Sequence, residues 1–242
     1  MASLRVAQIL AAVAGDVSAA TTLPQRLVDA CADSLPVSGA GIALMTDAGP
    51  AGTVAVTDRR ASLMEDLQFT LGEGPCVDSS LSGRPVLQPD LAATGPARWP
   101  GFSAAALEAG IGAVFALPLR VGGIRLGVLD LYRDQPGALT SRELTEALAH
   151  ADAATAILLH LQARTPANGT GTGLIPVVED HAAVHQATGI VSVQADVTLT
   201  EALGLLRARA FAADRSIVAL SHDVVAGLVH FTSGGGEIDN EG

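Results

Sequence analysis

Apolar residues in the first two thirds of the chain gather in short runs that are separated by turn-forming residues. One pair of runs flanks Asp47-Ala-Gly-Pro50, and a longer pair flanks Val121-Gly-Gly123, a pattern typical of hairpins. Pro118 predicts a bulge or an unpaired edge position, because proline cannot donate a backbone hydrogen bond. The runs therefore predict an antiparallel sheet with two hairpins, formed by residues 40–46 with 52–57 and by residues 113–120 with 124–133.

Three segments of the same region have the spacing of helices. In residues 141–164, apolar or small side chains recur every three or four positions, which is one face of a helix. Ser141 is the expected N-cap of this helix, with Leu144 in place of the usual acid of a capping box. Residues 2–13 and 23–34 also show helical spacing, so helices at both ends of a sheet predict an α+β domain over residues 1–164.

A change of pattern divides the chain after residue 164. Residues 165–176 are rich in Gly, Thr and Pro and are expected to form a flexible linker, and residues 232–242 an acidic disordered tail. Between them, residues 177–231 predict a small domain of three helices joined by short turns. These helices are expected at residues 178–194, at 199–213 after the capping box Thr198-Leu-Thr-Glu201, and at 217–231 after the N-cap Ser216.

Composition limits the classes of function. Hydrophobic residues make up 49% of the 242 residues, which excludes global disorder, and no run is long enough to span a membrane. The two cysteines fit a reducing cytoplasm, where we expect the protein to reside without membrane contact. All 14 basic residues are arginines and the formal net charge is −11, so electrostatic capture of nucleic acid would be weak unless arginines cluster.

The most distinctive short sequence is Leu71-Gly-Glu-Gly-Pro-Cys-Val-Asp-Ser-Ser80. Its glycines permit backbone conformations closed to other residues, and Pro75 suits the first turn of a short helix. Cys76 would then lie at a helix N-terminus, where the helix dipole lowers the pKa of a thiol. The alternatives are a reactive or ligand-facing thiol and a small cysteine buried in a tight turn.

Several enzyme and metal classes lack their residues. A nucleotide-hydrolysing P-loop needs a lysine, which the chain lacks, and Ser79 and Ser80 have no histidine near them in the sequence. His181 and His185 have a chelating spacing, but Ala182 replaces the glutamate of the zincin motif, so we predict no metal site there. His150 and His160 are expected on a helix surface. We therefore expect no catalytic residues and no enzyme activity, and the cofactor stays unknown.

The order of motifs in residues 22–164 resembles a GAF domain of the type common in actinobacterial regulators. The motifs are Gly72-Glu-Gly-Pro-Cys76, Gly83-Arg-Pro-Val86, Arg98-Trp-Pro100, Pro118-Leu-Arg120, Gly127-Val-Leu-Asp-Leu-Tyr132 and Leu139-Thr140. The resemblance implies an α+β fold with a central antiparallel sheet flanked by helices, and a role in sensing a small-molecule or redox signal. Cys76, Glu73 and Trp99 are the candidate sensing residues. The lysine-containing signature of cyclic-nucleotide GAF domains is absent from the sequence, which disfavours that ligand.

The C-terminal segment, residues 177–231, resembles the all-α three-helix ANTAR domain. The motifs are Ala187-Thr-Gly-Ile-Val191, Glu201-Ala-Leu-Gly-Leu-Leu-Arg207 and Val224-Val225. The resemblance implies binding to paired hairpins in nascent RNA and a role in transcription antitermination. Recognition of unpaired bases needs hydrogen-bonding, stacking and cationic groups. The candidate RNA-binding residues are His185, Gln186, Thr188, Arg207, Arg209 and Arg215.

Two features of this segment keep a second interpretation open. Thr188 stands where the family often has a basic residue, and six acidic residues outnumber three arginines. RNA binding would then depend on a homodimer that engages two loops at once. The alternative is a GAF-based dimerising sensor or interaction protein whose helical bundle no longer binds RNA.

Overall fold

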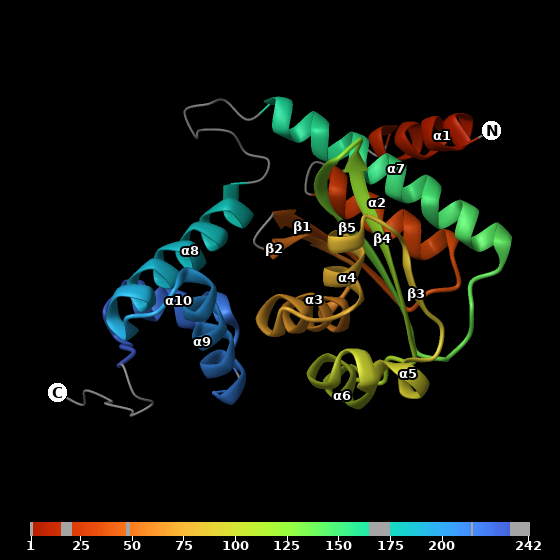
Figure 1. Cartoon of the computed structure of the whole chain (residues 1–242). Helices are drawn as coiled ribbons and strands as arrows, with labels where there is room; N and C mark the ends of the chain where they lie inside the picture. The colour runs from red at the N-terminus through yellow and green to blue at the C-terminus, as the bar shows by residue number, and fades with distance from the viewer. Residues whose placement is uncertain (1, 16–20, 47–48, 165–174, 214, 233–242) are drawn as a thin grey trace. The chain divides into compact units, whose positions relative to one another are not determined.

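The computed structural model describes residues 2–15, 21–46, 49–164, 175–213 and 215–232. The chain divides into two compact units, Met1–Ile175 and Pro176–Gly242. The predicted linker and tail lie almost wholly outside the described residues. Figure 1 shows the sheet of the first unit and the three helices of the second.

A five-stranded sheet with strand order β2-β1-β5-β4-β3 forms the centre of the first unit. All neighbouring strands are antiparallel, and both predicted hairpins are present, as β1 with β2 and β4 with β5. Strand β3 pairs only with residues 114–116 of β4, so Pro118 lies beyond this pairing, next to a register shift at Leu119/Arg120. The strands are β1 (Gly39–Thr46), β2 (Gly49–Val56), β3 (Val86–Gln88), β4 (Ala113–Val121) and β5 (Ile124–Arg133).

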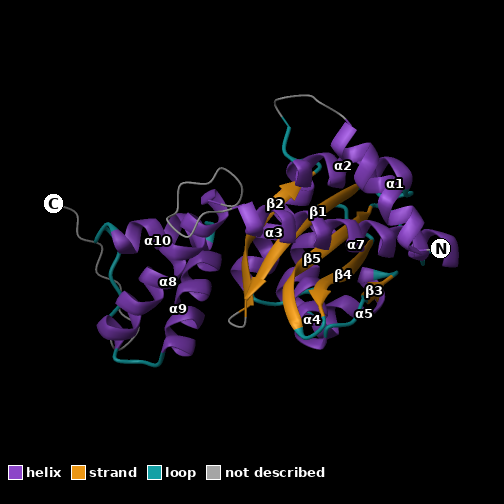
Figure 2. Cartoon of the chain, turned by 90° about the horizontal axis from the view of Figure 1, so that it is seen from above, coloured by secondary structure: helices purple, strands orange, loops and turns teal. Residues whose placement is uncertain are grey.

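Helices cover both faces of this sheet (Figure 2). On one face, α1 (Ala2–Gly15), α2 (Leu23–Ser34) and α7 (Ser141–Arg164) pack on Ile42, Phe115 and Leu131 and the strand residues that alternate with them. Successive side chains of a strand point to opposite faces, so Ala43, Ala116 and Asp130 face the other way. The helices of that second side are α3 (Arg59–Leu71), α4 (Pro75–Ser82), α5 (Leu91–Arg98) and α6 (Pro100–Glu108).

The start of α7 differs from the expectation. Thr140, not Ser141, caps the helix: the Glu143 backbone N–H donates to its hydroxyl at 3.3 Å. The Glu143 carboxylate accepts a hydrogen bond from the Thr140 backbone N–H at 2.7 Å, which completes a capping box. The predicted cap was one residue late, because a capping box needs an acid three residues after the cap and Leu144 cannot accept a hydrogen bond.

The two histidines of α7 have different environments. His160 is exposed, as expected of a helix surface. His150 is 1% exposed, and its Nδ1 lies 3.0 Å from the carbonyl oxygen of Glu146. The expectation of a surface position was therefore wrong for His150. His150 is buried because α1 and α2 pack on α7, and its Nε2 lies 3.5 Å from the Ser34 hydroxyl of α2.

The second unit contains α8 (Ile175–Ala195), α9 (Leu199–Ala212) and α10 (Ile217–Val225). The predicted stripe is buried, with Val184, Ala187 and Val191 between 0% and 5% exposed. The Thr198–Glu201 capping box and the Ser216 cap are both present. Helix α10 ends at Val225 rather than at residue 231, because Gly227 adopts a left-handed φ of 74° that terminates it.

Candidate functional site

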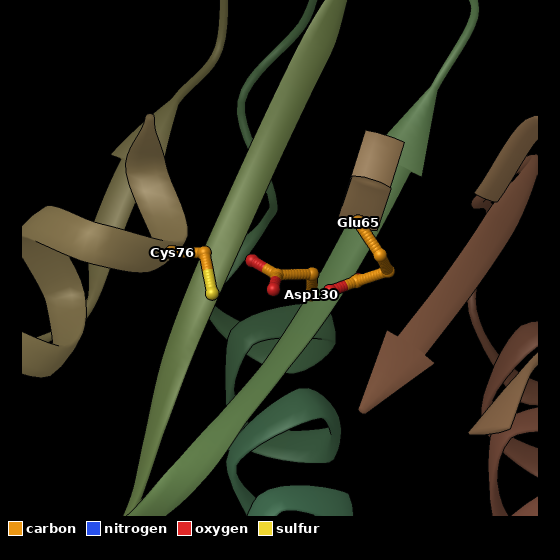
Figure 3. Close-up of side chains that lie close together, drawn as sticks. All are labelled: Glu65, Cys76 and Asp130. Atoms are coloured by element: carbon orange, nitrogen blue, oxygen red, sulfur yellow. The ribbon is translucent and has the colours of Figure 1, made fainter. Parts of the chain in front are cut away.

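Glu65, Cys76 and Asp130 meet on the face of the sheet that is covered by α3 and α4. One carboxylate oxygen from each acid and the Cys76 sulfur all lie within 4.8 Å of one another. Figure 3 shows the thiol and the Glu65 carboxylate on either side of Asp130, which projects between them. The exposed fractions of the three residues are 3%, 1% and 0%, so the site is a buried polar cluster in an otherwise apolar interior.

Local backbone features bring these three groups together. Asp130 occupies a strand position that alternates with the apolar Leu129 and Leu131 and so faces α3 and α4. Cys76 is the second residue of α4, which opens with Gly74 at a φ of 132° followed by Pro75. A side chain at Gly41 would overlap the Glu65 carboxylate, so the glycine on β1 provides the space for this acid.

A chain of hydrogen bonds connects Glu65 to the start of α4. The Tyr132 hydroxyl donates to Glu65 Oε1 at 2.8 Å and accepts from the Gln68 side-chain amide at 3.3 Å. The Gln68 side-chain carbonyl in turn accepts from the Cys76 backbone N–H at 2.8 Å. The network orients Glu65 but does not include Asp130. Among the described residues neither of its carboxylate oxygens has a nitrogen or oxygen donor, and the Cys76 thiol is the neighbouring group placed to donate to it.

Burial favours the neutral form of every ionisable group in the cluster. It raises the pKa of Asp130 to about 7, although the neighbouring Cys76 thiol opposes the shift. The pKa of Glu65 is raised by burial and by the charge of Asp130, against the hydrogen bond from Tyr132. The Cys76 pKa is raised by burial and then by the charges of Asp130 and Glu65. The predicted lowering of this thiol pKa is therefore wrong, because desolvation and two carboxylates outweigh the helix terminus.

The other two sensing candidates lie outside this cluster and have structural contacts. The Glu73 carboxylate accepts a hydrogen bond from the Phe102 backbone N–H at 2.8 Å, near the start of α6. Trp99 is 2% exposed, and its indole N–H donates to Asp78 at 3.1 Å. The Arg98 guanidinium lies 4.3 Å from the centre of the Trp99 ring and also pairs with Asp78. A sensing role for Glu73 or Trp99 stays a prediction.

Sequence reasoning missed Glu65 and Asp130. Asp130 carried a signal, since it is the single acid within the apolar run Val128-Leu-Asp-Leu-Tyr132 and had to be buried if that run was a central strand. Glu65 had no comparable signal. It precedes Asp66 in a helix of mixed polarity, and only the packing of α3 on β1 makes it a buried residue.

Comparisons with known proteins agree with this fold. The family model described as "GAF domain" matches residues 19–158, more than half of the chain. The chain belongs to the GAF domain family. No curated protein sequence matches it.

Solved GAF domains share the fold at low sequence identity. The GAF domain of a phosphoenolpyruvate-protein phosphotransferase (ptsP) from Coxiella burnetii is 17% identical, with a TM-score of 0.51 over 66% of this chain and 96% of that chain. The GAF domain from an Acinetobacter phosphoenolpyruvate-protein phosphotransferase is 12% identical, with a TM-score of 0.50 over 67% and 95% of the two chains. The GAF domain of the present chain has a role in small-molecule sensing or signalling.

The six RNA-binding candidates outside the GAF domain differ in exposure. His185 and Gln186 are exposed on α8. Thr188 is 7% exposed, and its hydroxyl donates to the carbonyl oxygen of Val184 at 2.7 Å. Thr188 is therefore part of the interior of the bundle, where its side chain is not available to contact RNA.

The three candidate arginines are also only partly available to contact RNA. Arg215 forms an ion pair with Asp223 at 2.6 Å. Arg207 is half-buried, and burial lowers its pKa. Arg209 lies near the end of α9 with its guanidinium 5.3 Å from the centre of the Phe231 ring. The structure therefore does not gather the arginines into one exposed cluster.

A helix needs about 20 predominantly apolar residues to cross a membrane. Within the described residues no single helix is long and apolar enough to cross a membrane. Residues 183–195 and 199–212 meet the length and composition criteria together, as a pair bent by 103°.

Proposed function

We propose that this chain is a signal-responsive RNA-binding regulator of transcription antitermination. The GAF domain would detect a small-molecule or redox signal, and the C-terminal helices would bind paired RNA hairpins. The proposed role is regulatory rather than catalytic. The observation that carries it is the two-sided character of α8: Ala187 and Val191 of the first ANTAR-like motif are buried, while the polar His185 and Gln186 directly before it are exposed.

An exposed imidazole and amide provide chemistry that suits unpaired bases. Imidazole rings stack on bases, and a glutamine amide can both donate to and accept from a base edge. Arg209 adds a cation for the phosphates, whereas Arg215 would first have to leave Asp223. The small number of available cations implies modest affinity for each module and a requirement for two modules on two hairpins.

The signal would act by changing the populations of two conformations. A ligand changes such an equilibrium only if it binds one conformation more tightly than the other. Helix α7 is the last element of the GAF unit and precedes the helical unit along the chain. We therefore expect the signal to change the packing of α1, α2 and α7 and thereby the spacing of two RNA-binding units in a homodimer.

Titration of a labelled two-hairpin RNA with the full chain tests this proposal. We expect Gln186→Ala combined with Arg209→Ala to weaken binding at least about tenfold, since two contacts of about 1 kcal/mol each are lost. Arg142→Ala is the matched control, because it removes one exposed arginine from the GAF unit. Equal binding by the wild type and the double variant would refute the site. Lack of binding at low salt by the dimeric wild type would refute the function.

One observation favours the second candidate function, a dimerising interaction protein. A shallow groove of about 560 Å³ on α8 is almost wholly apolar. It is lined by Gln186, Gly189, Ile190, Val193 and Gln194, and Val193 is 83% exposed. A second copy of the helix would remove this apolar surface from water. Val193→Glu should then lower the dimer fraction in analytical ultracentrifugation, and unchanged association of this variant would exclude the groove as the dimer contact.

A further inference from the structure

The Asp130 carboxylate is completely buried and has no nitrogen or oxygen donor among the described residues. Its side chain is 0% exposed, and the Cys76 thiol, itself one of the proposed ligands, is the neighbouring group placed to donate to its oxygens. Buried polar atoms are almost always paired, so a buried carboxylate without a nitrogen or oxygen donor needs a separate explanation. Figure 3 shows the Asp130 carboxylate directed towards the Cys76 sulfur, with Glu65 on the other side of Asp130.

We propose that Glu65, Cys76 and Asp130 bind a divalent transition-metal ion of the Zn²⁺, Co²⁺ or Fe²⁺ type. Each residue would supply one ligand atom, a carboxylate oxygen from each acid and the thiolate sulfur from the cysteine. Only the idea that the metal acts as a signal rests on the proposed sensory function. Metal binding itself rests on the geometry of the cluster.

The distances suit an ion after a small adjustment of side chains. A tetrahedral site with metal–sulfur bonds of about 2.3 Å and metal–oxygen bonds of about 2.0–2.2 Å places its ligand atoms about 3.3–3.6 Å apart. The three ligand atoms lie within 4.8 Å of one another, so no pair needs to close by more than about 1.5 Å. Rotation of the two carboxylates about their side-chain bonds can supply this movement without a change in the backbone.

The donor set determines the class of ion. A thiolate with two carboxylates favours a borderline-soft ion over Mg²⁺ or Ca²⁺, which prefer oxygen ligands alone. Three deprotonated ligands would place three negative charges in an apolar interior, and a divalent cation compensates two of them. Tyr132 would act as a positioning residue, since its hydroxyl already holds Glu65 Oε1 at 2.8 Å.

Three protein ligands leave a fourth position open. Structural zinc sites usually have four protein ligands, whereas sites with three hold a water or an exogenous molecule in the remaining position. Such a site can exchange its fourth ligand, which is the property required of a sensor. The ion would also link α3, α4 and β5, so a change of its fourth ligand could alter the packing of these elements.

The experiment is a titration of the metal-free full chain with Co²⁺, followed by absorption spectroscopy. Cobalt bound to a thiolate has an intense sulfur-to-metal band in the near ultraviolet, which carboxylate or imidazole ligands do not produce. We expect one equivalent of Co²⁺ to generate this band and Zn²⁺ to displace it. Asp130→Asn and Glu65→Gln should weaken binding at least about tenfold, as expected for the loss of a charged ligand. Cys76→Ser should abolish the band.

Cys31→Ser is the matched control. Cys31 is also buried, but it lies on α2 at the opposite face of the sheet, where burial raises its pKa to about 12. This variant should bind Co²⁺ like the wild type. Circular dichroism and thermal unfolding establish that each variant is folded, and Co²⁺ should raise the melting temperature of the wild type and of Cys31→Ser more than that of the three ligand variants.

The outcomes of the Co²⁺ titration can be told apart from those of the RNA titration that tests the proposed function. No sulfur-to-metal band in the wild type, or the same band in Cys76→Ser, would overturn the metal site whatever the result with RNA. A band that disappears with Cys76→Ser and weakens with Asp130→Asn would support it, even if the chain binds no RNA. Binding of the two-hairpin RNA is measured on the same preparations, so a failure of RNA binding alone refutes only the proposed output.

Discussion

The two faces of the GAF sheet use the same strands in opposite ways. On the face covered by α1, α2 and α7, Cys31 packs among apolar residues, and burial, with a smaller contribution from the charge of Glu146, raises its pKa to about 12. On the face covered by α3 and α4, Cys76 lies beside two carboxylates that raise its thiol pKa further. Leu129 and Asp130 are adjacent in the sequence and belong to opposite faces. Both faces bury apolar side chains that stabilise the fold, but the second also encloses two carboxylates, whose burial costs stability.

The largest expected difference between the faces appears when neighbouring residues are substituted. Leu129→Ala should lower the free energy of unfolding by about 2–5 kcal/mol, since it removes a buried side chain and leaves a cavity. Asp130→Asn should leave the metal-free protein as stable as the wild type or more stable, because it removes a buried carboxylate that has no nitrogen or oxygen donor among the described residues. Denaturant unfolding with a chelator measures both. A larger loss with Asp130→Asn than with Leu129→Ala would contradict the comparison.

The pH dependence of stability gives a second test of the difference between the two faces of the sheet. The pKa of Asp130 is about 7 in the folded protein, against about 3.9 in an unfolded chain. Between these values the folded protein holds a proton that the unfolded chain has released, so stability should fall as the pH rises from about 4 to about 7. The upper limit of the change is about 4 kcal/mol. Asp130→Asn should flatten this decline, and an unchanged slope in that variant would exclude Asp130 as its source.

A smaller loss of stability is expected when the space occupied by the Glu65 side chain is filled. Gly41→Ala would place a methyl group on the Glu65 carboxylate, and we expect a loss of about 1–3 kcal/mol from the forced displacement. Gly39→Ala is the matched control on the same strand, because the closest contact of its added carbon would be 3.2 Å, to Thr57 Oγ1. Equal thermal stability of the two variants would show that Glu65 does not depend on Gly41.

The smallest effect concerns the helix that closes the apolar face. Thr140→Ala should lower stability by about 1 kcal/mol through loss of the N-cap of α7. Ser141→Ala should have little effect, although Ser141 was the cap expected from the sequence. Thermal unfolding of the pair decides which residue is the cap, and a greater loss with Ser141→Ala would reverse the assignment.

Local patterns were sufficient for most of the fold because they depend on neighbouring residues. Alternating apolar runs and turn residues predicted β1, β2, β4 and β5, and helical spacing predicted α1, α2 and α7–α9. The end of α10 was missed because Gly227 stops it within an apolar stretch. Strand β3 and the helices α5 and α6 are short, so their periodicity was too brief to read.

The sequence by itself determined the GAF family, the elements of the sheet and the presence of Cys76 in a glycine-bounded turn. Only the tertiary structure decided what surrounds that cysteine. Glu65 and Asp130 are 65 positions apart, and they meet because α3 packs on a strand whose partner in the sheet carries Asp130. Periodicity reports which face a residue occupies, but the pKa of a thiol depends on charges that the chain brings to that face from distant segments.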